Sequence, residues 1–278
     1  MSLRRPSVAE ALLRYAGLVL MVTLTIGPFL WLLSTALKSP AENIHAFPPT
    51  LLPAEPTLGN FARVLQGQPF GRYLLNSCLV AALAVSCNLL LSSLAGYALA
   101  RIPFAGRTGV FALLLASMML PFQLLMIPVY ELALALGLHN TRLGLVLPHA
   151  CTAFGVFFMR QAFAGVPPAL EEAALVEGVS RWRIWWHVML PLVRPALATL
   201  AIFAFIGVWG DFLWPLIVVD DPRLFTLPLG VNRLASAFSM DWRLVAAGTV
   251  LSVLPILLVF ILSQRWFIEG AMKGAVKG

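Results

Sequence analysis

Six apolar runs, each long enough to cross a lipid bilayer, dominate this sequence. A spanning helix needs roughly 20 mostly apolar residues. Because 60% of the chain is hydrophobic and only 11% is charged, a water-facing globule could not cover the apolar surface, and we expect lipid to be its main solvent. The predicted spans are residues 15–37, 73–99, 110–130, 143–159, 197–219 and 244–262. The chain is therefore predicted to be an all-α membrane protein in which residues 1–278 form one domain of six transmembrane helices.

The net charge of +7 does not indicate a nucleic-acid partner, because the basic residues are scattered between the apolar runs and do not gather on one face. The first run, residues 15–37, is longer than the apolar core of a cleaved signal peptide and is predicted to be a retained span. If the amino terminus is inside, most of the 19 Lys and Arg residues lie in inner segments, as the positive-inside rule requires. Both termini are therefore predicted to be cytoplasmic.

Prolines mark the irregular parts of the chain. Residues 38–72 are polar and proline-rich, which indicates an external loop with one short helix around 61–65. Pro121 and Pro128 both lie inside the third predicted span. Each removes a backbone hydrogen bond and crowds the preceding turn, so we expect this span to be kinked.

The segment between the fourth and fifth predicted spans, residues 161–191, is too charged to lie in lipid. Prolines precede a helix-forming string, residues 169–177, and Gly178 suits a left-handed helix exit. Ser180 is placed to cap a second helix over residues 181–190, which is expected to end at the following proline. The pattern predicts a cytoplasmic helix-turn-helix.

Within this loop the residues follow the pattern E-A-A, three residues, G, nine residues, I, one residue, L-P. Its positions are filled by Glu172, Ala173, Ala174, Gly178, Val188, Leu190 and Pro191. Val188 replaces the usual Ile. The spacing resembles the docking loop of binding-protein-dependent import permeases of the ABC transporter superfamily. The resemblance implies that the loop, with the adjacent Glu171, docks an ATPase: Glu172 would offer a carboxylate, the two alanines would allow close approach, and Gly178 would permit the turn.

Further stretches are similar to the smaller membrane subunit of maltose-type sugar importers. They are residues 76–77, 209–216, 226–230 and 264–278. Two positions depart from the usual pattern, because Gly210 stands where Asn is frequent and Glu177 stands where Asp is frequent. The resemblance implies the type I ABC importer permease fold and a place in the inner cell membrane of a bacterium or archaeon.

The same resemblance implies the partners: a second homologous permease subunit, an ABC ATPase dimer and an extracytoplasmic solute-binding protein. No phosphate-binding G-x-x-x-x-G-K-[ST] run occurs in the sequence. We therefore expect ATP and Mg in the partner ATPase, with no cofactor bound by this chain and no enzymatic activity of its own.

Asp211 is the strongest candidate for the translocation pathway. It lies within the fifth apolar run, where an ionisable side chain is costly unless it faces protein or water. Asn88 and Gln123 are weaker candidates, since polar groups in spans also serve helix packing. The three cysteines and four histidines, His149 among them, lack the spacing of a disulfide framework or a metal site.

Three other functions remain open on the residues. One is an ABC importer of a non-sugar solute, against which the carboxyl-terminal resemblance argues. Another is an ion-coupled secondary transporter, which should show intramembrane charge pairs or repeated broken helices, whereas only Asp211 fits that expectation. A membrane enzyme is the third, and no catalytic constellation is apparent in the sequence.

Overall fold

The computed structural model describes residues 8–235 and 241–275, which contain helices and turns but no strand. Arg4, Arg5 and the last three residues of the tail lie outside the described residues. The chain forms two compact units. Unit 1 comprises Met1–Phe70 and Val231–Val253, and unit 2 comprises Gly71–Gly230 and Leu254–Gly278.

Unit 1 contains α1 (Val8–Leu37) and α2 (Gly59–Gly67). Two helices cross the boundary between the units, namely α13 (Leu227–Ala235) and α14 (Trp242–Ala275). The helix α2 confirms the short helix predicted around residues 61–65.

The end of α1 is fixed by polar side chains in unit 1. The buried Asn60 amide donates to the carbonyl oxygens of Ala36 and Lys38 at 2.9 and 2.8 Å, which satisfies acceptors that a helix terminus leaves free. Lys38 is also buried, and its ammonium donates to the Thr50 carbonyl at 2.6 Å. These bonds hold the proline-rich loop to the helix that precedes it.

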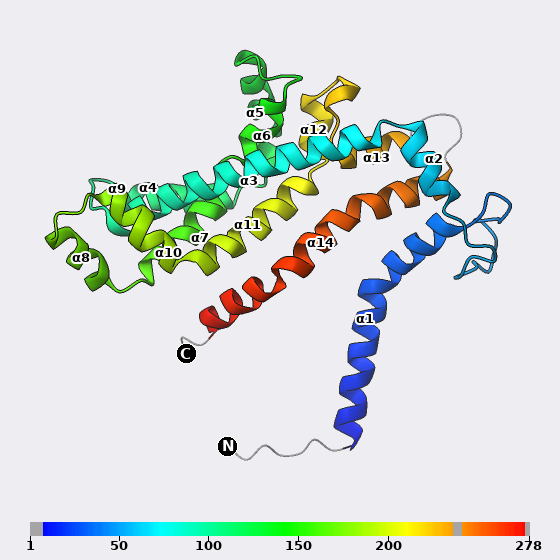
Figure 1. The fold of residues 1–278 in the computed structure, drawn as a ribbon, viewed down its shortest axis with the longest axis horizontal. Coiled ribbons are helices and arrows are strands. Elements are labelled where there is room, and N and C mark those ends of the chain that lie inside the picture. Colours follow the sequence, from blue (N-terminus) through cyan, green and yellow to red (C-terminus); the bar gives the residue numbers. More distant parts are fainter. Residues whose placement is uncertain (1–7, 236–240, 276–278) are drawn as a thin grey trace. The chain divides into compact units, whose positions relative to one another are not determined.

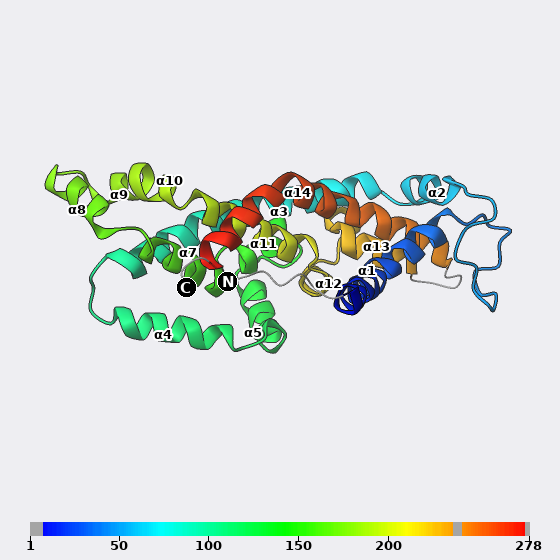
Figure 2. The ribbon, with the colours of Figure 1, turned by 90° about the horizontal axis from the view of Figure 1, so that it is seen from below.

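Unit 2 carries the remaining helices, and α3 begins at its border. They are α3 (Phe70–Arg101), α4 (Arg107–Met118), α5 (Phe122–Ala135), α6 (Arg142–Val146), η1 (Leu147–His149), α7 (Ala153–Ala164), α8 (Pro168–Val176), α9 (Arg181–Ile184), η2 (Trp185–Met189), α10 (Leu190–Leu192), α11 (Arg194–Trp209), α12 (Leu213–Val218) and η3 (Pro222–Leu224). Within unit 2, α3 and α11 run lengthwise, and α8, α9 and α10 lie at one end (Figures 1 and 2).

Three helices of the described chain are long and apolar enough to cross a membrane, and three bent helix pairs raise the number to six if each pair is one span. The sharpest bend, 106°, separates α4 from α5, and Figure 2 shows the two helices diverging at this point. Pro121 lies immediately before α5. Its missing N–H explains why the break falls there.

The fifth predicted span is divided. α11 ends at Trp209, and α12 begins only at Leu213. Between them, the Asp211 carboxylate accepts a hydrogen bond from the backbone N–H of Trp214 at 3.3 Å. This side chain therefore supplies an acceptor for the first turn of α12, in the manner of a helix cap.

Small residues bring α3 and α7 into close contact. A Cβ placed on Gly96 of α3 would lie 2.7 Å from the Met159 Cβ and 2.8 Å from the Arg160 nitrogen. A Cβ on Gly155 of α7 would lie 2.8 Å from Asn88 Oδ1. Since these positions lack room for a methyl group, the glycines let the two helices approach closely, with α7 backbone against Gly96 and polar α3 side chains against Gly155. We call them the α3–α7 pair.

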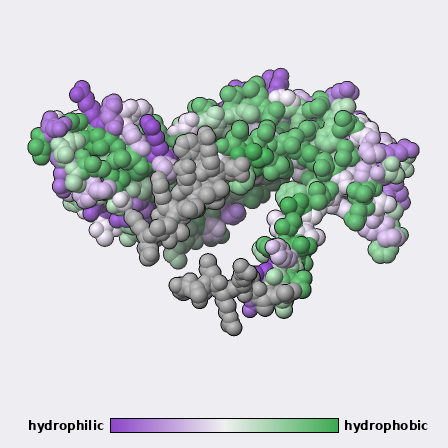
Figure 3. Space-filling view, turned by 60° about the horizontal axis from the view of Figure 1, so that its bottom comes forward, coloured by the Kyte–Doolittle hydropathy of each residue, from purple (hydrophilic) through white to green (hydrophobic). Residues whose placement is uncertain are grey.

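The surface of unit 2 differs between its middle and the end that carries α8 and α9. In Figure 3 hydrophobic residues cover its middle, and hydrophilic residues become frequent at the end that carries α8 and α9. α4 has no buried residue, and in α5 only Ala133 is buried. Exposed apolar helix surface of this kind is expected where lipid or another membrane subunit covers it.

Candidate functional site

The first helix of the predicted docking loop is α8. Pro168 occupies its first turn, where the missing N–H costs nothing. Gly178 follows the helix with φ +76°, the left-handed conformation that the sequence predicted for this turn. A Cβ at Gly178 would meet nothing within 4 Å. The glycine is therefore required by its backbone angle and not by lack of space.

The second helix of the loop differs from the prediction. The helical path continues past Pro191 to Leu192, and Trp185–Met189 forms a π-helical turn just before the proline. A proline N carries no hydrogen and its ring crowds the carbonyl one turn earlier, so a local widening lets the helix pass it. Ser180 stands at the cap position, but its side chain makes no capping hydrogen bond.

A hydrophobic cluster fastens this loop to the spans of unit 2. Ile184, Trp185 and Met189 of the second helix are fully buried against Met159 and Phe163 of α7. Ala174, Val179, Val188 and Leu190 pack around the same cluster. Ala174 and Leu190 of the predicted docking motif are thus partly buried against this cluster.

The two adjacent glutamates of α8 have opposite environments. Glu172 and its neighbour Ala173 are exposed. The Glu171 side chain is only 8% exposed and accepts a hydrogen bond from the Tyr97 hydroxyl at 2.7 Å. The sequence assigned both glutamates to the docking surface, whereas the structure turns Glu171 toward α3. Glu172 is the one that a partner can reach.

Glu171 belongs to a cluster of four polar side chains that we call the anchor cluster: Tyr97, Arg101, Glu171 and Arg181. The guanidinium groups of Arg101 and Arg181 lie 3.7 Å from separate oxygens of the Glu171 carboxylate. Arg101 also donates to the carbonyl oxygens of Phe163, at 2.6 Å, and Val166. A cation at the carbonyl end of α7 is favourable for the helix dipole.

A second polar group lies at the start of α7, beside the interior of α3. The Asn88 amide donates to the His149 carbonyl at 2.9 Å and to the Thr152 hydroxyl at 3.1 Å. Thr152 in turn caps α7 by accepting from the Gly155 N–H at 3.1 Å. Asn88, a predicted pathway candidate, therefore fixes the start of α7.

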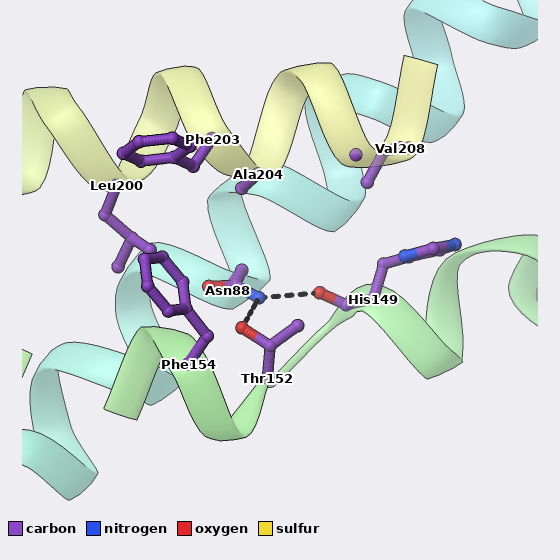
Figure 4. A pocket seen from close by; sticks show the side chains of 9 residues that line it. Asn88, His149, Thr152, Phe154, Leu200, Phe203, Ala204 and Val208 are labelled. Carbon is purple, nitrogen blue, oxygen red and sulfur yellow. Dashed lines mark hydrogen bonds between the residues drawn. The ribbon is translucent and has the colours of Figure 1, made fainter. Parts of the chain in front are cut away.

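A cavity of about 160 Å³ adjoins these bonds, and we call it the α7–α11 pocket. Figure 4 shows Phe154, Leu200 and Phe203 at one side of it, with Asn88 and Thr152 near the middle. The full lining is Asn88, His149, Thr152, Phe154, Leu200, Phe203, Ala204, Gly207 and Val208. The pocket therefore offers aromatic and aliphatic surface with a few polar groups.

Asp211 is connected to the α7–α11 pocket by His149, which lines the pocket and pairs with the Asp211 carboxylate. The His149 Nε2 and an Asp211 carboxylate oxygen lie 2.9 Å apart, with the two side chains 22% and 17% exposed. Sequence reasoning missed His149, because its spacing from other polar residues carries no signal. A carboxylate in an apolar run requires a partner, and that requirement was the available clue.

The third candidate, Gln123, is placed elsewhere. It lies in α5 with an exposed side chain and is not among the residues that line the α7–α11 pocket. The structure thus brings Asn88 and Asp211 together around His149 but leaves Gln123 apart. Among the described residues, no group of three or more His, Cys, Asp or Glu side chains could hold a metal ion.

Comparison with known proteins gives consistent matches. Residues 89–271 match the family described as binding-protein-dependent transport system inner membrane component. The chain is 38% identical to the arabinooligosaccharide transport permease AraQ of Halalkalibacterium halodurans over 81% of each chain. It is 34% identical to the lactose transport permease LacG of Rhizobium radiobacter over 96% of each.

A third relative, the sulfoquinovosyl glycerol transport permease SmoH of Agrobacterium fabrum, is 32% identical over 96% of this chain and 94% of its own. Among solved structures, a bacterial ABC transporter that imports the acidic polysaccharide alginate has a chain that superimposes with a TM-score of 0.82. That match covers 95% of this chain and 99% of the other, at 24% identity.

These matches confirm the predicted fold, an all-α permease of the type I ABC importer kind. They also set aside the ion-coupled transporter, because the matching family is defined by dependence on a binding protein. The chain belongs to the family of inner membrane components of binding-protein-dependent transport systems.

Proposed function

We propose that this chain is one of two homologous membrane subunits of an ATP-driven importer for a sugar or sugar-like solute. The observation that supports this most is the agreement with relatives named for arabinooligosaccharide, lactose and sulfoquinovosyl glycerol transport, each aligned over 81% or more of the chain. A solute-binding protein outside the membrane delivers the cargo. The alginate importer, in one solved structure, is in complex with a periplasmic protein that carries an alginate pentasaccharide.

ATP hydrolysis takes place in a separate ATPase dimer that docks on α8. Glu172 and Ala173 are on the exposed surface of this helix, and the left-handed Gly178 sets the turn that follows it. A carboxylate on such a surface suits a basic partner, since charge-assisted hydrogen bonds are stronger than neutral ones. ATP and Mg stay in the ATPase, and this chain binds no cofactor.

The α7–α11 pocket contributes one wall of the translocation pathway. Its volume of about 160 Å³ is below the roughly 300–1,000 Å³ of typical ligand pockets. A second permease subunit would therefore be needed to complete a space for a sugar. Phe154 and Phe203 provide apolar ring surface there, and the His149–Asp211 pair supplies polar groups nearby.

The docking loop faces the cytoplasm, and both termini lie on the same side. Single cysteines, in a protein that lacks Cys78, Cys87 and Cys151, would test this orientation. A cysteine at Glu55 should react with an impermeant thiol reagent from outside, and one at Arg107 only after permeabilisation. Labelling of position 107 from outside would overturn the orientation.

The function itself is tested by purifying the tagged protein in mild detergent and identifying its companions. We expect an ATPase, a second homologous permease and a sugar-binding protein, and sugar uptake by vesicles that contain the assembly and ATP. Uptake driven by an ion gradient without ATP would contradict the proposal. Stimulation by a binding protein specific for an amino acid or a polyamine would contradict the assignment to sugars alone.

A further inference from the structure

Glu171 is enclosed by two other parts of unit 2, although its helix is the one that carries the exposed docking surface. Tyr97 and Arg101 come from the last turns of α3, and Arg181 comes from the first turn of α9. All three approach the same carboxylate, whose side chain is 8% exposed. A buried carboxylate is stable only if it is paired and hydrogen-bonded, and here both conditions are met.

Arg101 extends this connection to α7. Its side chain is 11% exposed and donates to the carbonyl oxygens of Phe163 and Val166, which follow the end of that helix. One guanidinium therefore links α3, to which it belongs, to α8 and to the end of α7. An arginine suits this position because its planar group offers several donors in fixed directions.

The adjacent Glu172 does not take part in these contacts and is exposed. Neighbouring residues on a helix point about 100° apart. One of the two carboxylates is therefore directed to the spans, and the other to whatever docks on α8. The same short helix has a contact surface and an attachment surface.

We infer that Glu171, with Tyr97 and Arg101, is a positioning site that locks α8 to the ends of α3 and α7. A displacement of α8 by its partner then moves the α3–α7 pair as one body. The inference rests on the proposed function, because it needs a partner that moves α8. Glu171 contacts neither ATP nor solute, and its role is to transmit force.

The first test is a distance measurement on purified protein. Spin labels go on cysteines at Val176 of α8, which is 88% exposed, and at Leu90 of α3, which is 46% exposed, with the native cysteines removed. We expect one narrow distance distribution in the otherwise unaltered protein and a broad one in Glu171→Gln. An equally narrow distribution in Glu171→Gln would overturn the inference, whatever the protein transports.

The second test measures coupling in vesicles that contain the whole assembly. Glu171→Gln should retain its ATPase, but solute taken up per ATP hydrolysed should fall roughly tenfold, within the usual range of coupling between sites. Glu177→Gln is the matched control, because it makes the same chemical change on an exposed glutamate that follows α8 and takes no part in these contacts. It should leave the solute transported per ATP unchanged.

Three outcomes are distinguishable. Loss of the ATPase in Glu171→Gln, in proportion to the loss of uptake, would make Glu171 a docking residue and overturn the inference alone. Absence of any ATPase with the unaltered protein would overturn the proposed function.

If Glu171→Gln does not accumulate in the membrane, Tyr97→Phe serves instead, since it removes one hydroxyl and keeps every charge. Normal coupling and a narrow distribution in Tyr97→Phe would then also count against the inference.

Discussion

The anchor cluster and the α7–α11 pocket lie at opposite ends of α7, and a carboxylate that needs partners in a hydrophobic chain lies within the first and beside the second. At the anchor cluster two arginines and a tyrosine enclose Glu171. Beside the pocket a single histidine pairs with Asp211, next to a cavity of about 160 Å³. The first arrangement ties α8 to α3 and α9 through its carboxylate. The second has open space beside it, and this space is the wall that we propose for the pathway.

This difference predicts that substitutions in the anchor cluster affect stability and coupling, whereas substitutions at the pocket affect transport. The largest effect is expected for Arg101→Leu. It leaves the Glu171 carboxylate without its buried counter-charge and removes the donor to Phe163 and Val166. Breaking one side of a buried ion pair costs about 3–5 kcal/mol. Thermal unfolding in detergent and membrane yield are the measurements.

Arg63→Leu is the control for that substitution. Arg63 pairs with Asp241 at 3.2 Å, but its side chain is 51% exposed. Surface pairs of this kind contribute about 0–1 kcal/mol. If the two arginine variants lose the same stability, the anchor cluster is not the tightly paired site that its burial indicates.

The next effect is expected for Asp211→Leu. It leaves the His149 ring and the Trp214 N–H without their acceptor, at a cost of about 1–3 kcal/mol for a buried unsatisfied group. Uptake should fall while the ATPase remains bound, and Asp211→Asn should retain part of the uptake because an amide oxygen still accepts. Asp220→Leu is the matched control: Asp220 also pairs with a histidine, at 3.3 Å, but is 78% exposed. Loss of the bound ATPase in Asp211→Leu would contradict the expectation that substitutions at the pocket affect transport and not ATPase binding.

Gly178→Val should have an intermediate effect. The left-handed conformation, φ +76°, costs a residue with a Cβ about 1–2 kcal/mol. We expect less bound ATPase and less uptake, with normal membrane abundance because the spans are unchanged. Gly178→Asn should be nearly normal, since asparagine adopts this conformation more easily. Equal loss in both variants would mean that the missing side chain, and not the backbone angle, is what the turn needs.

The smallest effect is expected for Asn88→Ala. It removes the donor to the His149 carbonyl and the Thr152 hydroxyl, and one hydrogen bond contributes about 0.5–1.5 kcal/mol. Uptake should fall moderately, and ATPase binding should not change. Gln123→Ala is the control, because Gln123 is exposed and does not line the pocket. A larger loss of uptake in Gln123→Ala than in Asn88→Ala would indicate that the pathway does not pass the pocket.

The fold was predictable because apolar length and proline position are local properties of the sequence. Three of the runs that predict spans lie within α1, α3 and α14, and Pro121 lies at the break of the third run. The turn at Gly178 was predictable for the same reason. The break before α12 was not, because Gly210 and Asp211 interrupt an otherwise continuous apolar run by only two residues.

The sequence predicts where the docking loop lies along the chain, but the contacts within it could be predicted only in part. The sequence marks Glu171 and Glu172 alike, since both are acidic residues near a helix start. Which one is buried depends on Tyr97 and Arg101, more than 60 residues earlier in the chain. His149 was missed for a similar reason, because its partnership with Asp211 joins residues 62 positions apart. Such pairings follow from tertiary packing, and no regular spacing in the sequence indicates them.

The length of α7 limits which changes this protein can tolerate. Its cap, Thr152, adjoins the pocket, and its end, at Phe163, binds Arg101 of the anchor cluster. Its 12 residues span about 18 Å, and adding or removing one would rotate one end against the other by about 100°. We therefore expect that side chains of α7 can be exchanged where they contact none of α3, α4 and α11, whereas the number of its residues cannot change. The α4–α5 break, with almost no buried side chains, carries no such constraint on length.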